Sequence, residues 1–173
     1  MNNTFIRNLL RGLGLILFQV AVLARLDLSI GDFTFIHIII YPFFILLLPI
    51  NTPKVGVLIL AFATGIFVDF FYNSPGVHAA SMLVTAYLRP LVLRILVPNE
   101  GYSTKFSPTL IQMGFNWFIS YTSISLFIFC FSYFSFDAFS FVYFFGIFMN
   151  AVFTIIPSIF VFIIIHYLFR SKI

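Results

Sequence analysis

The sequence is poor in charge and in cysteine. Lysine, arginine, aspartate and glutamate together make up 8% of its 173 residues, whereas 62% are hydrophobic. A soluble domain carries about 25% charged residues, so this chain has too little polar surface to dissolve in water. We therefore expect an integral membrane protein in the lipid bilayer. The single cysteine, Cys130, excludes an intramolecular disulfide and a thiolate metal cluster.

Patterns that carry catalysis or nucleic-acid binding are also missing. There is no G-x-S-x-G turn, no serine–lysine pair at mid-membrane, no carboxylate pair and no glycine-rich phosphate loop. His37, His78 and His166 fall on three different apolar runs, without the spacing of a metal site. The net charge of +4 lies at the ends of apolar runs and forms no basic patch. We expect no enzymatic activity, no cofactor, no metal and no nucleic acid.

What the sequence does contain is a series of long apolar runs. A membrane-spanning helix needs about 20 such residues, and short connections place consecutive helices side by side. The sequence predicts an all-α fold, a polytopic membrane bundle of about six transmembrane helices, in which residues 1–173 form a single integral membrane domain. The predicted spans are Asn8–Ala24, Phe33–Ile50, Val55–Tyr72, Val77–Val97, Leu110–Tyr133 and Phe139–Phe169.

The distribution of lysine and arginine predicts the orientation of this bundle. Positively charged residues concentrate in cytoplasmic connections. With six spans, Arg25 is the only one of the nine lysines and arginines on the outer side. The other eight share the opposite side: Arg7, Arg11, Lys54, Arg89, Arg94, Lys105, Arg170 and Lys172. We therefore expect a multi-pass membrane protein with both termini in the cytoplasm (N-in/C-in).

Small and polar residues recur at helical spacing inside the predicted spans. Gly146, Asn150, Thr154 and Ser158 follow one another at intervals of four and share one face of the last span. Such stripes let helices approach closely and form hydrogen bonds that lipid cannot offer. The stripes predict packing between helices, with a polar cavity as the alternative.

The segment Gly65–Pro90 predicts a helical hairpin. Asp69 lies near the end of one apolar run, and Asn73-Ser74-Pro75-Gly76 connects it to the next. Ser74 is a good N-cap, Pro75 fits the first position of a helix, and Gly76 permits close backbone approach.

Two charged residues of this hairpin are the candidate sites. The Asp69 carboxylate could bind the free N–H groups of Gly76, Val77 and His78 at the start of the fourth span, with the His78 side chain as a further donor. The alternatives are a partner contact or a proton or cation site. Arg89 is expected to reach the cytoplasmic interface beside Arg94, or to bond carbonyls freed by Pro90. The two candidates differ in depth by more than about 10 Å, which argues against a direct salt bridge.

The hairpin resembles the signature of the bacterial rod shape-determining protein MreD family. A G-x-x-x-D pattern, a Ser/Pro/Gly turn, small residues and an L-x-x-A-Y-L run carry the resemblance: Gly65, Asp69, Pro75, Gly76, Ala79, Ala80, Leu83, Ala86, Tyr87 and Leu88. The residues singled out as a partner-binding or structural hairpin are Gly65, Asp69, Pro75, Gly76, His78, Tyr87 and Arg89.

This resemblance implies a function that composition cannot supply. It implies a non-enzymatic scaffold of the rod-shape cell-wall elongation machinery, which binds the membrane-anchored protein MreC and supports peptidoglycan synthesis and cell shape. Through MreC it would be linked, indirectly, to the RodA glycosyltransferase, a class B penicillin-binding transpeptidase and MreB filaments.

The resemblance also provides the alternative hypothesis. The family is similar in fold to the substrate-binding S-components of energy-coupling-factor vitamin transporters. An S-component needs a sealed outer pocket, usually with longer outer loops. Here the outer connections are short, at Arg25–Asp32, Asn73–Gly76 and Phe134–Ala138.

Overall fold

The computed structural model describes residues 2–22, 37–98, 101–102, 107–139 and 143–168, with the side chains of α1 and α7 described at 12–21 and 144–165. These residues form helices and no strand, which confirms the predicted all-α class. The helices are α1 (Asn2–Ala21), α2 (Phe43–Leu46), α3 (Lys54–Tyr72), α4 (Val77–Ile95), α5 (Leu110–Met113), α6 (Phe115–Ala138) and α7 (Phe144–Leu168).

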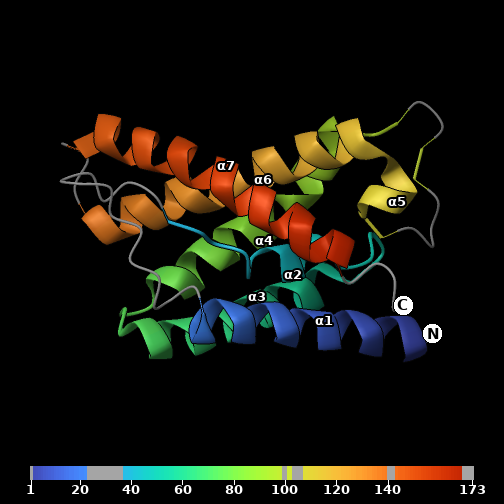
Figure 1. Ribbon diagram of the computed structural model, residues 1–173, viewed down its shortest axis with the longest axis horizontal. Coiled ribbons are helices and arrows are strands. Elements are labelled where there is room, and N and C mark those ends of the chain that lie inside the picture. The colour runs from blue at the N-terminus through green and yellow to red at the C-terminus, as the bar shows by residue number, and fades with distance from the viewer. Residues whose placement is uncertain (1, 23–36, 99–100, 103–106, 140–142, 169–173) are drawn as a thin grey trace.

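The other long helices lie around α4 and the short α2 (Figure 1). Helices α1 and α3 lie along one side, α6 and α7 along the other, and α4 runs between them. Helix α4 packs against both α3 and α6, and α6 packs against α7. The short α2 lies in the middle and contacts α1, α3, α4 and α6.

Three of the described helices are long and apolar enough to cross a membrane. They are Lys54–Tyr72, Phe115–Ala138 and Phe144–Ile165, and Gly12–Ala21 is a shorter apolar helix. Helix α4 is also 19 residues long, but it contains His78, Arg89 and Arg94, which lower its hydropathy.

The second predicted span is not a continuous helix. Within its described part, residues 37–50, only the single turn Phe43–Leu46 is α-helical. Pro42 and Pro49 flank that turn, and proline disfavours helical conformation in the residue before it. The prediction was wrong here because an apolar run by itself cannot distinguish a span from a buried irregular segment.

The fifth predicted span is also divided. Gly114 adopts φ 81°, which few other residues tolerate, and it separates α5 from α6. Helix α6 therefore begins at Phe115 rather than at Leu110, and it continues past the predicted end to Ala138. The prolines inside α4 and α7, Pro90 and Pro157, do not end their helices.

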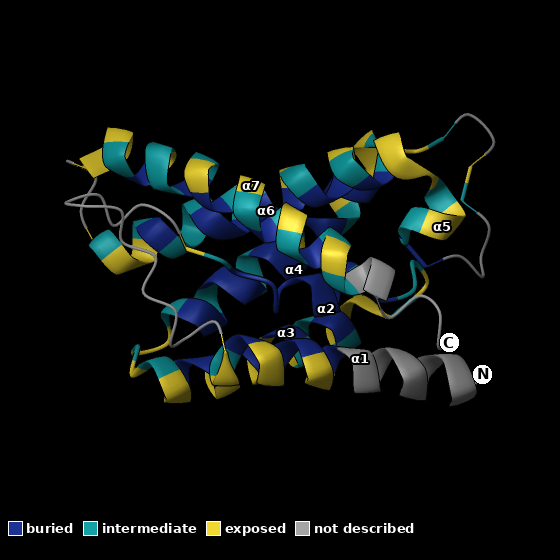
Figure 2. Cartoon of the chain, viewed as in Figure 1, coloured by how far each residue is buried: buried dark blue, intermediate teal, exposed yellow. Residues whose placement is uncertain are grey.

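The hydrophobic core is built around residues 39–48, which we call the central segment. Ile40, Tyr41, Phe43 and Leu46 have no exposed surface at all. Its side chains enter two clusters: one contains Tyr41 and residues of α1, α3, α4, α6 and α7, and the other contains Phe43. Figure 2 shows the buried residues gathered at the centre and exposed residues on the outer faces of α1, α3 and α7.

Candidate functional site

The Asp69 carboxylate binds the start of α4, as the sequence predicts. Its Oδ1 accepts a hydrogen bond from the His78 main-chain N–H at 3.0 Å, and its Oδ2 accepts one from the Ala79 N–H at 2.9 Å. The Ser74 hydroxyl also donates to Oδ1, at 2.5 Å. Asp69 is only 6% exposed. A side chain of α3 therefore supplies the acceptors that the free N–H groups of α4 require.

The turn itself differs in detail from the prediction. The N-cap of α4 is Gly76, with φ 84°, and it forms no side-chain cap hydrogen bond. Ser74 bonds Asp69 instead of capping the helix, and Pro75 precedes α4 rather than occupying its first position. The Asp69 carboxylate of the preceding helix, and not a residue of the turn, caps α4, because it lies within reach of the His78 and Ala79 N–H groups.

Gly65 allows α3 and α4 to touch along their main chains. A Cβ atom at this position would lie 2.3 Å from the Ala79 Cα and 2.7 Å from the Ala79 nitrogen. Backbone atoms cannot move away as a flexible side chain can, so glycine is required by the close approach. Gly65 and Asp69, one helical turn apart, therefore act on the same contact.

The His78 side chain does not bond the Asp69 carboxylate, contrary to the prediction. Its Nδ1 shares a hydrogen bond of 2.7 Å with the Tyr41 hydroxyl, and its Nε2 is buried without a partner among the described residues. The rings of Tyr72 and Tyr133 lie 5.0 and 4.8 Å from the His78 ring. Tyr41 was not predicted as a partner of His78 because it lies in an apolar run that was predicted to form a continuous helix.

Arg89 is buried in the bundle, so it is not the interfacial side chain that was predicted. It is 3% exposed, its Nε donates to the Tyr121 hydroxyl at 3.1 Å, and its Nη2 donates to the Leu48 carbonyl. The carbonyl that it bonds belongs to Leu48 of the central segment and not to the turn of α4 that Pro90 interrupts. Tyr121 in turn donates to the Leu46 carbonyl at 3.0 Å. The carbonyls beyond the single turn of α2 have no helical partner, and an apolar interior offers none. Arg89 and Tyr121 replace that partner.

The other end of the central segment is held by Gln19 and Ser158. The Gln19 amide donates to the Ile38 carbonyl at 3.1 Å, and its oxygen accepts from the Ile40 N–H at 2.9 Å. The Ser158 hydroxyl accepts from the Ile39 N–H at 2.9 Å. Ser158 belongs to the predicted polar stripe of the last span. Its hydroxyl binds a main-chain N–H that would have bonded within its own helix if residues 37–50 were helical.

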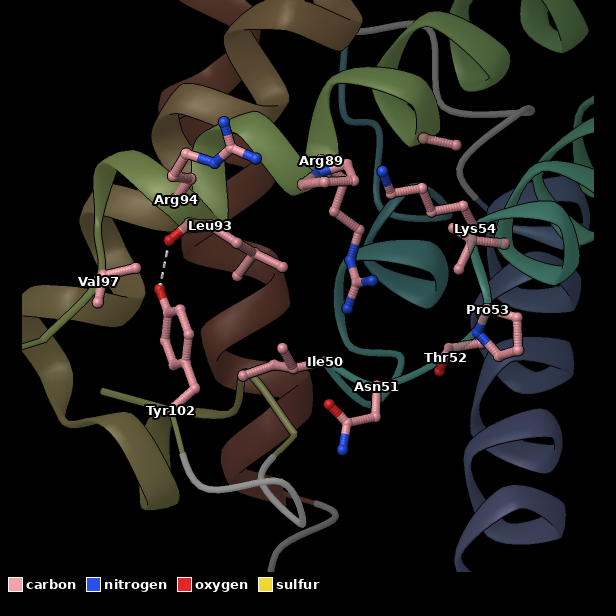
Figure 3. A pocket seen from close by; sticks show the side chains of 13 residues that line it. Ile50, Asn51, Thr52, Pro53, Lys54, Arg89, Leu93, Arg94, Val97 and Tyr102 are labelled. Atoms are coloured by element: carbon pink, nitrogen blue, oxygen red, sulfur yellow. Dashed lines mark hydrogen bonds between the residues drawn. The ribbon is translucent and has the colours of Figure 1, made fainter. Parts of the chain in front are cut away.

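A cavity of about 440 Å³ opens at the end of the bundle where α3 begins and α4 ends. Its polar lining residues are Asn51, Thr52, Lys54, Arg89, Arg94 and Tyr102, and none of its lining residues is acidic. In Figure 3 the Lys54 side chain extends toward Arg89, which reaches toward Ile50 and Asn51. The Tyr102 hydroxyl donates to the Leu93 carbonyl at 2.7 Å, and burial raises the pKa of this phenol above its ordinary value.

The remaining singled-out residue, Tyr87, is 74% exposed on the outer face of α4. It lies away from the Asp69 contact and from the Arg89 network. Within the described ranges, no three His, Cys, Asp or Glu side chains gather closely enough to hold a metal ion. The buried polar side chains in the described ranges form separate networks, one around Asp69, one around Arg89 and one at Gln19 and Ser158.

No protein-family model, curated protein or solved structure matches this chain.

Proposed function

We propose that this protein is a non-enzymatic, multi-pass scaffold of the bacterial inner membrane that binds an MreC-type protein in the rod-shape cell-wall elongation machinery. The observation that carries the proposal is the α3–α4 hairpin. Three residues of the MreD-like pattern, Gly65, Asp69 and Ala79, belong to one physical contact, in which Gly65 admits the Ala79 main chain and Asp69 binds its N–H group.

The distribution of polar groups supports a scaffold rather than a catalyst. Asp69, Arg89, Gln19 and Ser158 all bond main-chain groups inside the bundle. Their hydrogen bonds stabilise the fold and give no constellation of nucleophile and base.

The outer faces of the long helices are apolar and aromatic. On α3, Ile59 and Phe70 are 63% and 79% exposed, and on α7, Phe145 and Phe160 are 73% and 65% exposed. Such faces suit lipid or a transmembrane helix of a partner, because helices in membranes associate through close packing. A single-span MreC-type protein would bind such a face.

Orientation and span number belong to the same proposal. The bundle has about six membrane segments with both termini in the cytoplasm, since eight of the nine lysines and arginines then share one side. The central segment counts as one of these segments although it is not a helix. Irregular backbone is tolerated at membrane depth where protein surrounds it, and Ile40 and Tyr41 are fully buried.

The alternative of a vitamin-binding S-component has less support. Its substrate pocket would open on the outer side, where Asp69 lies in this orientation. The described side chains there are closely packed, with His78 3% exposed. The cavity described above opens at the Lys54 end of α3, about 22 Å from Asp69 at 1.5 Å per residue.

Co-purification tests the proposal. The tagged protein, extracted in mild detergent, should retain an MreC-type single-span protein. Depletion of the protein described here should convert rod-shaped cells into round cells. Recovery of a transporter ATPase in place of the MreC-type protein, or unchanged cell shape after full depletion, would contradict the proposal.

A further inference from the structure

The charge of Arg89 has no counter-charge in the described part of the chain. Its Nε and Nη2 groups donate to neutral oxygens, those of Tyr121 and Leu48. A buried guanidinium whose charge is not compensated is costly. The dipoles of the two oxygens offset only part of this cost. The structure therefore favours an anion beside Arg89.

The cavity next to Arg89 increases the positive charge. Lys54 and Arg94 line it, both are exposed, and no carboxylate is found among its lining residues. Three cations around one cavity repel one another, so an anion between them would lower the energy of all three. Asn51 and Thr52 add polar groups at the rim.

The cavity also has an apolar wall. Val57 and Leu93 are buried, at 3% and 6% exposed, and they line the cavity together with Ala86. A charged head beside an apolar stem fits this combination of surfaces. The cavity lies at the end of α3 and α4, where the polar headgroups of a bilayer would meet it.

We propose that this cavity binds an anionic phosphate group, with Arg89 at its base and Lys54 and Arg94 at its rim. The apolar wall favours the headgroup of an anionic phospholipid as the source of that phosphate, and free phosphate is the other source. The proposal rests on the membrane location and not on the role in cell-wall elongation.

Native mass spectrometry of the detergent-solubilised protein tests this site with phosphatidylglycerol, phosphatidylcholine and inorganic phosphate as probes. Arg89 holds the Leu48 carbonyl, so the variants are made at the rim. We expect Lys54→Gln and Arg94→Gln each to weaken phosphatidylglycerol binding about five-fold, and the double variant about twenty-five-fold. The charge-conserving Lys54→Arg and Arg94→Lys are the matched controls and should bind as the wild type does.

The outcomes separate the two sources and can overturn the proposal. Selective, cation-dependent binding of phosphatidylglycerol supports a lipid headgroup, whereas cation-dependent binding of inorganic phosphate alone supports free phosphate. Equal binding of phosphatidylglycerol and phosphatidylcholine without an effect of the variants would overturn the site. The wild-type chain includes Glu100, which lies outside the described residues. If the Glu100 carboxylate occupied the cavity, neither phosphatidylglycerol nor inorganic phosphate would bind there. That result also overturns the proposal.

Discussion

The guanidinium of Arg89 on α4 and the phenol of Tyr121 on α6 are joined by a hydrogen bond of 3.1 Å in the interior of the bundle. Both groups also donate to carbonyls of the central segment, Arg89 to Leu48 and Tyr121 to Leu46. Helices α4 and α6 thus hold the end of the central segment, most of which is not helical. The same logic, polar side chains bonding exposed main chain, governs Gln19, Ser158 and Asp69.

Removing the phenol of Tyr121 should destabilise the bundle. Tyr121→Phe leaves the Leu46 carbonyl and one Arg89 N–H without a partner, and each unsatisfied buried group costs about 1–3 kcal/mol. Thermal unfolding in mild detergent measures the loss. Tyr143→Phe, at a position 65% exposed, is the control and should change the unfolding free energy by less than about 0.5 kcal/mol. Equal stability of the two variants would contradict the role of Tyr121.

Ser158 should behave in the same way at the other end of the central segment. Ser158→Ala removes the acceptor of the Ile39 N–H and should cost about 1–3 kcal/mol. Ser120 is exposed and bonds only a carbonyl of its own helix, so Ser120→Ala should have little effect. Hydrogen exchange at the Ile39 amide, measured alongside unfolding, should accelerate in Ser158→Ala only. Unchanged exchange would show that the hydroxyl is not needed there.

Gly65 should not tolerate a side chain. Gly65→Ala places a methyl group 2.3 Å from the Ala79 Cα, and relieving that clash should cost about 1–3 kcal/mol of unfolding free energy. Gly56 lies on the same helix with nothing within 4 Å of an added Cβ. Gly56→Ala should therefore keep the stability or raise it by up to about 1 kcal/mol through helix propensity. Equal destabilisation by both would argue against the close α3–α4 contact.

The hairpin could be predicted from sequence, whereas the central segment could not. Asp69 lies nine and ten residues before the two N–H groups that it binds, across a single turn, so local rules were enough to place the carboxylate at the start of α4. The central segment reads as one apolar run, and its partners Gln19, Arg89 and Ser158 lie far away in the sequence. Pro42 and Pro49, seven residues apart, were the only local signal that this run does not form a helix.

The proposed orientation can be tested with single introduced cysteines. Cysteines at Asn3 and Ser171 should resist a membrane-impermeant thiol reagent in intact cells, whereas cysteines at Ser29 and Ser135 should be labelled. The native Cys130 is fully buried and should stay silent. Labelling of both termini from outside would reverse the orientation.

Variants of Asp69 test most directly whether the buried polar groups stabilise the fold while the partner binds its outer faces. Asp69→Asn removes the charge and turns one of the two accepting oxygens into an NH2 donor, so it should cost about 1–3 kcal/mol. Asp69→Leu should cost more, because the N–H groups of His78 and Ala79 lose their acceptor.

The deciding measurement is the amount of MreC-type protein recovered per folded molecule of these two variants. We predict that this ratio equals that of the wild type, while thermal stability falls from wild type to Asp69→Asn to Asp69→Leu. Variants that keep full stability and fail to recover the partner would contradict the account and place Asp69 in the partner interface.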